Sequence, residues 1–322
     1  MRIEMRDISK AFGSNQVLEK IDLVIESGQV HALMGENGAG KSTLMNILTG
    51  LFPATTGTIL IDNQEVVFPN PQIAEEAGLS FIHQEMNTWP EMTVLENLFL
   101  GRELKTPIGF LDQKAMKFKA QAVFNRLGIN IPLDTIISQL SVGQQQMIEI
   151  AKSLLSEISI LIMDEPTAAL TDRETETLFS IISSLKNEGV GIVYISHRME
   201  EIFKITDLVT VMRDGVVVDT KPTAETTPKE LVKKMVWREM SDYYPEKSAR
   251  IGDIAFEVEH LTGDGFEDAS FYVREGEILG FSGLMGSGRT ELMRAIFGLS
   301  KKTSGTMKIA GDEIDITTPS QA

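Results

Sequence analysis

Positions 35–42 read Gly35-Glu36-Asn37-Gly38-Ala39-Gly40-Lys41-Ser42. This stretch matches the pattern G-x-x-x-x-G-K-[S/T] in full, with an apolar run over 30–34 before it and a helical pattern over 41–49 after it. A strand, a glycine-rich loop and a helix form the context in which this pattern binds phosphates. Average residue frequencies give such a match by chance in roughly one chain of this size in a hundred, and the context lowers that rate further.

The chemistry of this loop indicates a nucleotide. Glycines let backbone N–H groups curl around the β- and γ-phosphates, and the helix N-terminus adds partial positive charge. Lys41 would neutralise the phosphates, and the Ser42 hydroxyl would hold Mg²⁺. We therefore expect ATP and Mg²⁺ as cofactors, bound by residues 35–42 and by Thr43.

A second stretch places two acids at the end of an apolar run. Residues 158–163 read ISILIM and lead into Asp164 and Glu165. A fully apolar strand is typical of the interior of a parallel sheet, and ligands bind at the carboxyl ends of such strands. Alone, the pattern is more often a strand that leaves the core. Downstream of a phosphate-binding loop, it predicts that Asp164 holds Mg²⁺ through water and that Glu165 polarises the attacking water.

Hydrophobic periodicity predicts an α/β fold with a parallel sheet covered on both faces. The apolar and alternating runs predict strands over 2–8, 17–26, 30–34, 57–61, 79–83, 158–163, 191–195, 208–213 and 216–219. The helical patterns cover 41–49, 93–101, 113–127, 141–155, 172–187 and 228–236.

The chain repeats itself at an offset of 248 positions, which pairs Gly35-x-x-Gly38-x-Gly40 with the glycines at 283, 286 and 288. The same offset pairs the glycines at 28, 50 and 57 with those at 276, 298 and 305. Glycines in one register indicate a duplicated domain. We expect a first domain over 1–240, a polar linker over 241–252, and the opening of a second copy over 253–322, which stops before most of its motifs.

Residues 140–144 read LSVGQ, between the phosphate loop and the apolar strand. They resemble the LSGGQ signature of ABC ATPases, with Val142 in place of the first glycine. Ser141 stands at a helix start, so its hydroxyl and the Gly143 amide can face a phosphate. A plain serine N-cap is the alternative interpretation, and both can hold together.

Other motifs resemble those of ABC ATPases in the expected order. Gln84 matches the glutamine that contacts Mg²⁺ and water and faces the membrane subunit. His197 matches the switch histidine of the γ-phosphate, whereas the histidines at 31, 83 and 260 are interpreted as structural. Phe12 stands where the family stacks an aromatic ring on adenine, with a core phenylalanine as the alternative. Thr171 and Glu174 form a capping-box pattern.

This resemblance covers essentially the whole chain and implies a P-loop NTPase of the ABC type, with an N-terminal antiparallel β subdomain and a helical signature subdomain. The duplicated layout resembles the fused double ATPase of ribose-, galactose- and xylose-type importers, with ribose favoured on overall resemblance alone. The family implies an ATPase on the cytoplasmic side of the cell membrane, peripheral and in contact with it only through two permease subunits. An extracellular sugar-binding protein would serve them.

The second copy departs from the first at its phosphate loop. At the matching positions of the second copy, Arg289 stands in place of Lys41 and Glu291 stands in place of Thr43. Arginine carries a bulkier, differently aimed charge, so we expect a degenerate site. In this family ATP lies between the loop of one copy and the signature of the other, so a second ATPase half or a second copy of the chain must complete the intact site.

Composition and charge weigh against the rival functions. The chain has no cysteine and a net charge of −16, which argues against cysteine zinc sites and against nucleic acid. No apolar run approaches the ~20 residues that span a bilayer. The main alternative is a soluble ABC ATPase acting on the ribosome or nucleic acid, yet only 56 residues lie between Gln84 and Ser141, too few for a long coiled coil. An exporter ATPase and a non-enzymatic ATP sensor are further alternatives.

Overall fold

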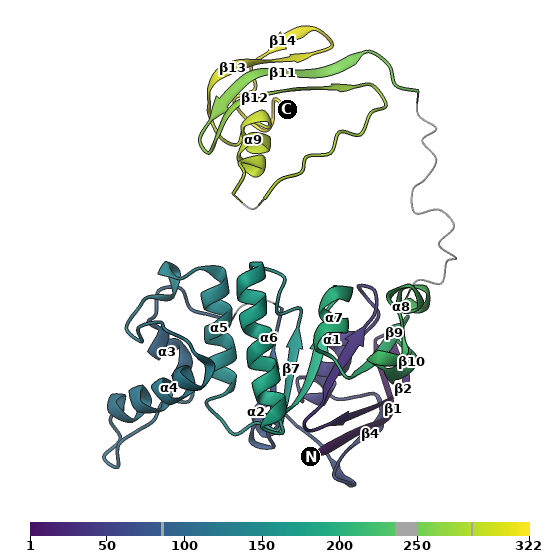
Figure 1. The fold of residues 1–322 in the computed structure, drawn as a ribbon, viewed down its shortest axis with the longest axis vertical. Coiled ribbons are helices and arrows are strands. Elements are labelled where there is room, and N and C mark those ends of the chain that lie inside the picture. Colours follow the sequence, from purple (N-terminus) through teal and green to yellow (C-terminus); the bar gives the residue numbers. More distant parts are fainter. Residues whose placement is uncertain (85–86, 236–249, 285) are drawn as a thin grey trace. The chain divides into compact units, whose positions relative to one another are not determined.

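The computed structural model describes residues 1–84, 87–235, 250–284 and 286–322. It divides into two compact units, Met1–Met240 and Ser241–Ala322 (Figure 1). Most of the linker expected over 241–252 lies outside the described residues. In the described part of the chain, no helix has the length and apolar character needed to cross a membrane.

A six-stranded sheet forms the centre of the first unit. Its neighbouring strands run parallel except at one edge, where β10 pairs with β9 antiparallel. The strands β3, β7 and β8 are buried at every residue, as is typical of strands inside a parallel sheet covered on both faces. In sheet order, the strands are β10 (Val216–Pro222), β9 (Leu208–Arg213), β3 (Val30–Met34), β8 (Gly191–Ile195), β7 (Ile160–Asp164) and β6 (Leu79–Ile82).

The two faces of this sheet belong to two hydrophobic cores. Along β7, Leu161 and Met163 join one core, whereas Ile160 and Ile162 join the other, because successive side chains of a strand point to opposite faces. The first core packs against helices α3 to α7, and the second packs against α1 and the N-terminal sheet. The helices are α1 (Lys41–Leu48), α2 (Pro71–Glu76), α3 (Val94–Phe99), α4 (Gln113–Leu127), α5 (Val142–Ser153), α6 (Asp172–Asn187), α7 (Met199–Ile205) and α8 (Pro228–Met235).

An antiparallel sheet with the order β2-β1-β4-β5 completes the first unit. Its strands are β1 (Arg2–Phe12), β2 (Asn15–Glu26), β4 (Thr56–Ile61) and β5 (Gln64–Val66). Burial alternates along β2, which is the pattern of a sheet with one face on a core. The expected parallel sheet, antiparallel part and helical part are therefore confirmed.

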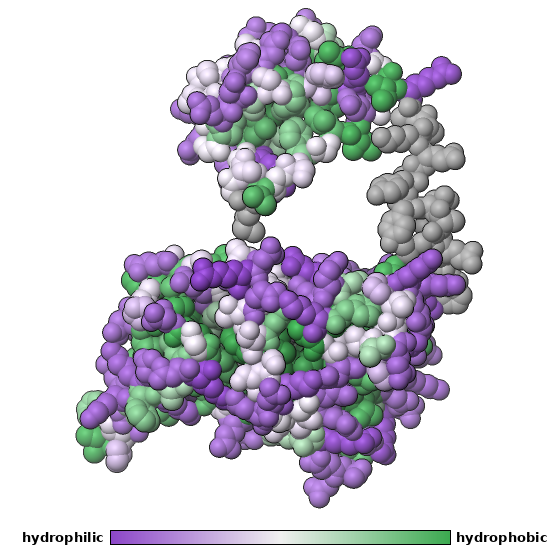
Figure 2. All heavy atoms as spheres, viewed as in Figure 1, coloured by the Kyte–Doolittle hydropathy of each residue, from purple (hydrophilic) through white to green (hydrophobic). Residues whose placement is uncertain are grey.

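The helical part projects where α3 leads into α4 (Figure 1). Ile108, Phe110 and Phe118 are exposed in this projection. Figure 2 shows the corresponding hydrophobic, green tip beside mostly hydrophilic surface. Asp112 caps α4 by accepting a hydrogen bond from the Ala115 amide. The helix therefore begins at a capped N-terminus within this projection.

The second unit repeats the antiparallel sheet with the order β12-β11-β13-β14. The helix that aligns with α1, α9 (Arg289–Ile296), packs on this sheet through a core that includes Leu292 and Met307. The strands are β11 (Ile254–Gly263), β12 (Phe266–Arg274), β13 (Lys302–Ile309) and β14 (Asp312–Ile314). The glycine repeat predicts this shared order, because glycines at matching positions adopt the same left-handed turns: φ is 72° at Gly28 and at Gly276.

The first hairpin differs between the two units. The left-handed residues Asp7 and Lys20 flank it in the first unit and stand 13 positions apart. Their counterparts in the second unit, His260 and Asp268, stand eight positions apart. The second hairpin is thus five residues shorter, so the offset of 248 does not extend back to the first strand.

Candidate functional site

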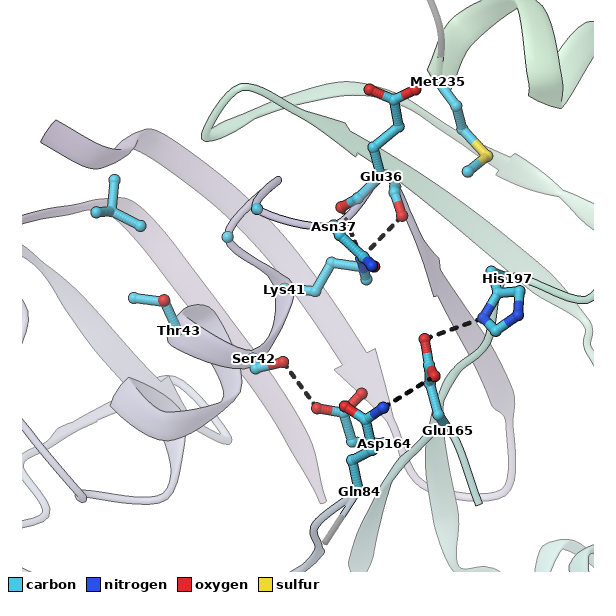
Figure 3. Close-up of a pocket in the computed structure, with 14 residues that line it drawn as sticks. Glu36, Asn37, Lys41, Ser42, Thr43, Gln84, Asp164, Glu165, His197 and Met235 are labelled. Atoms are coloured by element: carbon cyan, nitrogen blue, oxygen red, sulfur yellow. Dashed lines mark hydrogen bonds and ion pairs between the residues drawn. The ribbon is translucent and has the colours of Figure 1, made fainter. Parts of the chain in front are cut away.

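A cavity of about 980 Å³ opens at the carboxyl ends of the central strands (Figure 3). Phosphate-loop residues line it together with side chains that follow β6, β7 and β8. Met235 and Val17 also line it, and neither is predicted from the motifs. The described residues around it are Val17, Gly35, Glu36, Asn37, Gly38, Gly40, Lys41, Ser42, Thr43, Gln84, Asp164, Glu165, His197 and Met235.

The phosphate loop joins β3 to α1 through Gly40, which has a φ of 96°. A Cβ at Gly40 would lie 2.5 Å from the Leu18 side chain, so both the backbone angle and the space favour glycine there. Ala39 is buried behind the loop and is not among the described lining residues. The loop therefore turns its backbone toward the cavity and its one apolar side chain toward the core.

Lys41 reaches across the loop from the first turn of α1. Its Nζ donates to the backbone oxygens of Gly35 at 2.8 Å and Glu36 at 2.9 Å (Figure 3). Burial lowers the pKa of the Lys41 ammonium, against the opposite effect of the Asp164 and Glu165 carboxylates. The Lys41 ammonium is thus held against the phosphate loop at the cavity lining, where phosphate oxygens can replace the two carbonyls.

Ser42 and Asp164 form the second contact between the loop and the central sheet. The Ser42 hydroxyl donates to Asp164 Oδ2 at 2.7 Å. Burial raises the pKa of Asp164, and the hydrogen bond from Ser42 opposes that rise. A hydroxyl and a carboxylate side by side are hard oxygen donors that fit Mg²⁺, which keeps several waters and completes its shell with substrate phosphates. The residues present therefore fit the expected cation, with Gln84 nearby.

Glu165 is the meeting point of three segments. Its carboxylate accepts from Gln84 Nε2 at 3.2 Å and pairs with His197 Nδ1 at 3.0 Å (Figure 3). Its backbone lies in the left-handed region with a φ of 47°, which is uncommon for a residue with a side chain. The Glu165 amide donates to the Ile195 oxygen at 2.9 Å, which anchors this turn to β8. A carboxylate aimed into the cavity in this way can accept a proton from, or orient, a water molecule.

Phe12 lies at the end of β1 and is 49% exposed, which does not favour a core role. Its ring meets that of Phe52 edge to face at 5.4 Å, and Lys10 Nζ lies 5.0 Å from its centroid. It is not among the described residues that line the cavity. Its exposed ring is compatible with stacking on a base, and that role stays a prediction.

The signature residues occupy the start of α5. Ser141 caps this helix in a box with Gln144, so the plain-cap interpretation is confirmed. Gly143 is buried, and a Cβ there would overlap the carboxylate of Glu174. Glu174 also caps α6 with Thr171, as the sequence predicts. Neither Ser141 nor Gly143 is among the described residues of the cavity, so the structure does not bring the chain's own signature to its own phosphate loop.

Comparison with known proteins identifies the family. The family model described as ABC transporter matches residues 18–168 and 266–322. The chain belongs to the ABC transporter family. Both halves of the ABC match begin inside the hairpins that precede the two phosphate loops, which agrees with the repeat.

Named relatives in the ABC family match along the whole chain. It is 74% identical over 322 residues to the ribose import ATP-binding protein RbsA of Streptococcus agalactiae serotype Ia. It is 67% identical over 322 residues to the protein of the same name from Lactococcus lactis subsp. lactis. All of the chain is aligned in both cases, and it spans 65% of the length of each relative.

Solved ABC structures share the fold of the first unit. A nucleotide-free ATP-binding cassette from an ABC transporter aligns with a TM-score of 0.66 at 26% identity, over 73% of this chain and 99% of that one. An ATP-binding cassette in its ADP conformation aligns with a TM-score of 0.63 at 26% identity, over 72% of this chain and 94% of that one.

The second phosphate loop keeps two left-handed glycines of the first, at 286 and 288, and changes the chemistry. Gly288 precedes α9 with a φ of 83°, as Gly40 precedes α1 with 96°. Arg289 stands where Lys41 stands in the first loop. The segment that carries Phe12 has no counterpart of equal length, because the second hairpin is five residues shorter. The second phosphate loop thus has arginine in place of the lysine. The hairpin before it has no segment that matches the one carrying Phe12, the residue predicted to stack on adenine.

We expect a photoreactive ATP analogue to label the first phosphate loop at least ten-fold more than the second. The physical reasons are the replaced lysine, the extra carboxylate of Glu291 and the short hairpin. Peptide mapping after irradiation measures the ratio, and excess unlabelled ATP controls for nonspecific capture. Stronger labelling around Arg289 than around Lys41 would overturn the assignment of the second site as degenerate.

Proposed function

We propose that this chain is the ATP-binding and ATP-hydrolysing part of an ABC importer for ribose or a related monosaccharide. The observation that carries the proposal is one cavity that gathers Lys41, Ser42, Gln84, Asp164, Glu165 and His197. The names of the 74% and 67% identical relatives support import of ribose. No described residue is suited to select among sugars in this site, so the sugar rests on the relatives alone.

The geometry suggests a division of labour for hydrolysis. The backbone of residues 35–40 and Lys41 would bind the phosphates, with Ser42, Asp164 and Gln84 around Mg²⁺. The cation, when bound, neutralises charge that develops on the phosphoryl oxygens. Glu165 would orient the attacking water, held in place by its bonds to Gln84 and His197. His197, which is mostly exposed and pairs with this carboxylate, would contact the γ-phosphate.

The partners and location follow from the same proposal. Two permease subunits would bind the ATPase on the cytoplasmic side of the membrane, and an extracellular sugar-binding protein would deliver the sugar. The net charge of −16 favours membrane attachment through these proteins over direct adsorption to anionic lipid. No observation in the described structure favours the ribosome or nucleic acid as a partner.

Uptake of radiolabelled sugars tests the transport proposal. A strain without the gene should lose ribose uptake, and the wild-type gene should restore it while the Lys41→Ala gene should not. Loss of uptake of another monosaccharide instead would change the sugar. Unchanged uptake of ribose, galactose and xylose would reject transport of these sugars.

We expect ATP turnover by the 322-residue chain to rise with its concentration. The sequence carries a single LSVGQ signature, which lies apart from the cavity, so a competent site needs the signature of another chain. Pairing of two chains is bimolecular and weakens on dilution. Turnover per chain is measured across a thousand-fold dilution series, and an excess of the Ser141→Arg chain should suppress it. High, constant turnover by particles shown to be monomeric would contradict this expectation.

A further inference from the structure

A buried carboxylate behind the cavity has no role in the mechanism above. Glu201, on α7, is 5% exposed. Its neighbour Glu200 is exposed, so the sequence alone does not distinguish the two acids. Burying a carboxylate is unfavourable unless hydrogen bonds satisfy its oxygens, so the partners of Glu201 indicate what it holds.

Both oxygens of Glu201 are occupied. Oε1 accepts from the Thr167 hydroxyl at 2.7 Å and from Arg198 Nη1 at 3.3 Å. Oε2 accepts from the Tyr194 hydroxyl at 2.8 Å and from the Ser196 hydroxyl at 2.9 Å. Burial, and then the adjacent Glu201 carboxylate, raise the pKa of Tyr194, so this hydroxyl keeps its proton and donates. The four donors come from two separate segments of chain.

Those two segments carry the reacting groups of the cavity. Thr167 lies two residues after Glu165, and Ser196 directly precedes His197. Ser196 Oγ also accepts from the Arg198 amide at 3.0 Å, so the turn around His197 is bonded on both sides. Glu201 therefore ties the loop of the water-orienting carboxylate to the loop of the histidine that pairs with it.

The left-handed turn at Glu165 needs a hydrogen bond that holds it in place. A side chain in the left-handed region persists only where the surrounding structure over-determines it. The Glu165 amide is bonded to Ile195 on one side, and the Ala168 amide donates to the Glu165 oxygen at 3.2 Å on the other. The buried Thr167–Glu201 bond fixes the turn to α7, and no other side-chain bond from residues 165–168 to α7 is found in the described structure.

We propose that Glu201 is a positioning residue for ATP hydrolysis, which holds the Glu165 and His197 loops in one geometry from behind the cavity. This inference rests on the proposed ATPase function. Glu201 contacts neither the phosphate loop nor any lining residue of the cavity through a described hydrogen bond. It acts on turnover rather than on nucleotide binding.

Four substitutions test this proposal. Glu201→Gln keeps the volume and replaces one acceptor oxygen by a donor, and Thr167→Val removes the donor on the loop. Thr167→Ser keeps the hydroxyl and should rescue. Glu200→Gln is the matched control, because it makes the same change one position away on the exposed side of α7. Each variant is measured for kcat, for KM, for affinity toward a fluorescent ATP analogue and for melting temperature.

We expect Glu201→Gln and Thr167→Val each to lower kcat at least ten-fold with nucleotide affinity within three-fold of wild type. Thr167→Ser and Glu200→Gln should stay within two-fold of wild type. The double variant Glu201→Gln/Thr167→Val should lose less than the product of the two single losses, because both substitutions weaken the same connection between α7 and the Glu165 loop. Wild-type kcat in Glu201→Gln would overturn the proposal, as would a loss of kcat and nucleotide affinity together.

A second measurement keeps the inference testable even if the proposed ATPase function fails. Hydrogen exchange of the backbone amides of residues 164–171 reports the Glu165 turn directly. Exchange should be at least ten-fold faster in Glu201→Gln than in wild type and unchanged in Glu200→Gln. Equal exchange in wild type and Glu201→Gln would reject the positioning role, whether or not ATP is hydrolysed.

Discussion

Replacing Glu165 by Gln is expected to lower ATP turnover by about 10²–10⁴-fold, the usual contribution of a positioned general base. Binding of ATP should stay within a few-fold of wild type, because the phosphate loop and Lys41 are untouched. Glutamine keeps the shape and can still contact Gln84 and His197. It removes the negative charge that makes the carboxylate a proton acceptor for water.

Single-turnover hydrolysis and equilibrium binding of the same nucleotide separate these two effects. The matched control is Glu200→Gln, which makes the same change in an exposed carboxylate outside the cavity lining. If Glu165→Gln and wild type hydrolyse ATP at equal rates, Glu165 has no part in the chemical step.

Replacing Lys41 by Ala should weaken ATP binding by roughly 10²-fold. A hydrogen bond to a charged group contributes about 1.5–3 kcal/mol, and Lys41 Nζ can offer more than one to the phosphates. The partial burial of Lys41 strengthens these contacts because water screens them less. Lys41→Arg is the informative companion, since it copies the second phosphate loop, and it should fall between wild type and alanine.

Isothermal titration with ATP and Mg²⁺ measures both Lys41 variants. Lys117→Ala serves as a control, because it removes an exposed lysine that pairs with Asp134 and lies outside the cavity lining. Wild-type affinity in Lys41→Ala would remove this lysine from the phosphate site.

Local patterns predicted most of the first unit. The glycines of the phosphate loop, the apolar strand before Asp164, the serine cap at Ser141 and the capping box at Thr171 act over short stretches, so the sequence alone reveals them. Boundaries shifted where tertiary pairing decided them: the strand predicted over 158–163 begins at Ile160 and includes Asp164. The short elements β5, α2 and α7 were missed, because three to seven residues carry too little periodicity.

Long-range bonding accounts for what the sequence could not show. Glu200 and Glu201 are identical in type and adjacent, and what distinguishes them is the burial of Glu201 among donors from Thr167, Tyr194, Ser196 and Arg198. The shortened second hairpin escaped notice because every glycine pair used to set the register lies after it. Motif matching located the reacting side chains, whereas their supports depend on which segments the fold brings together.

The bonds of Lys41 and Ser42 have a consequence for how ligands are selected. Both groups already have an internal partner: loop carbonyls for the Lys41 ammonium and a carboxylate for the Ser42 hydroxyl. A ligand therefore exchanges these partners and cannot simply add new bonds. An anion with few oxygens, such as inorganic phosphate, competes poorly with this closed set. A triphosphate displaces several partners in a single event, so the cavity favours multivalent anions before any contact with the base is made.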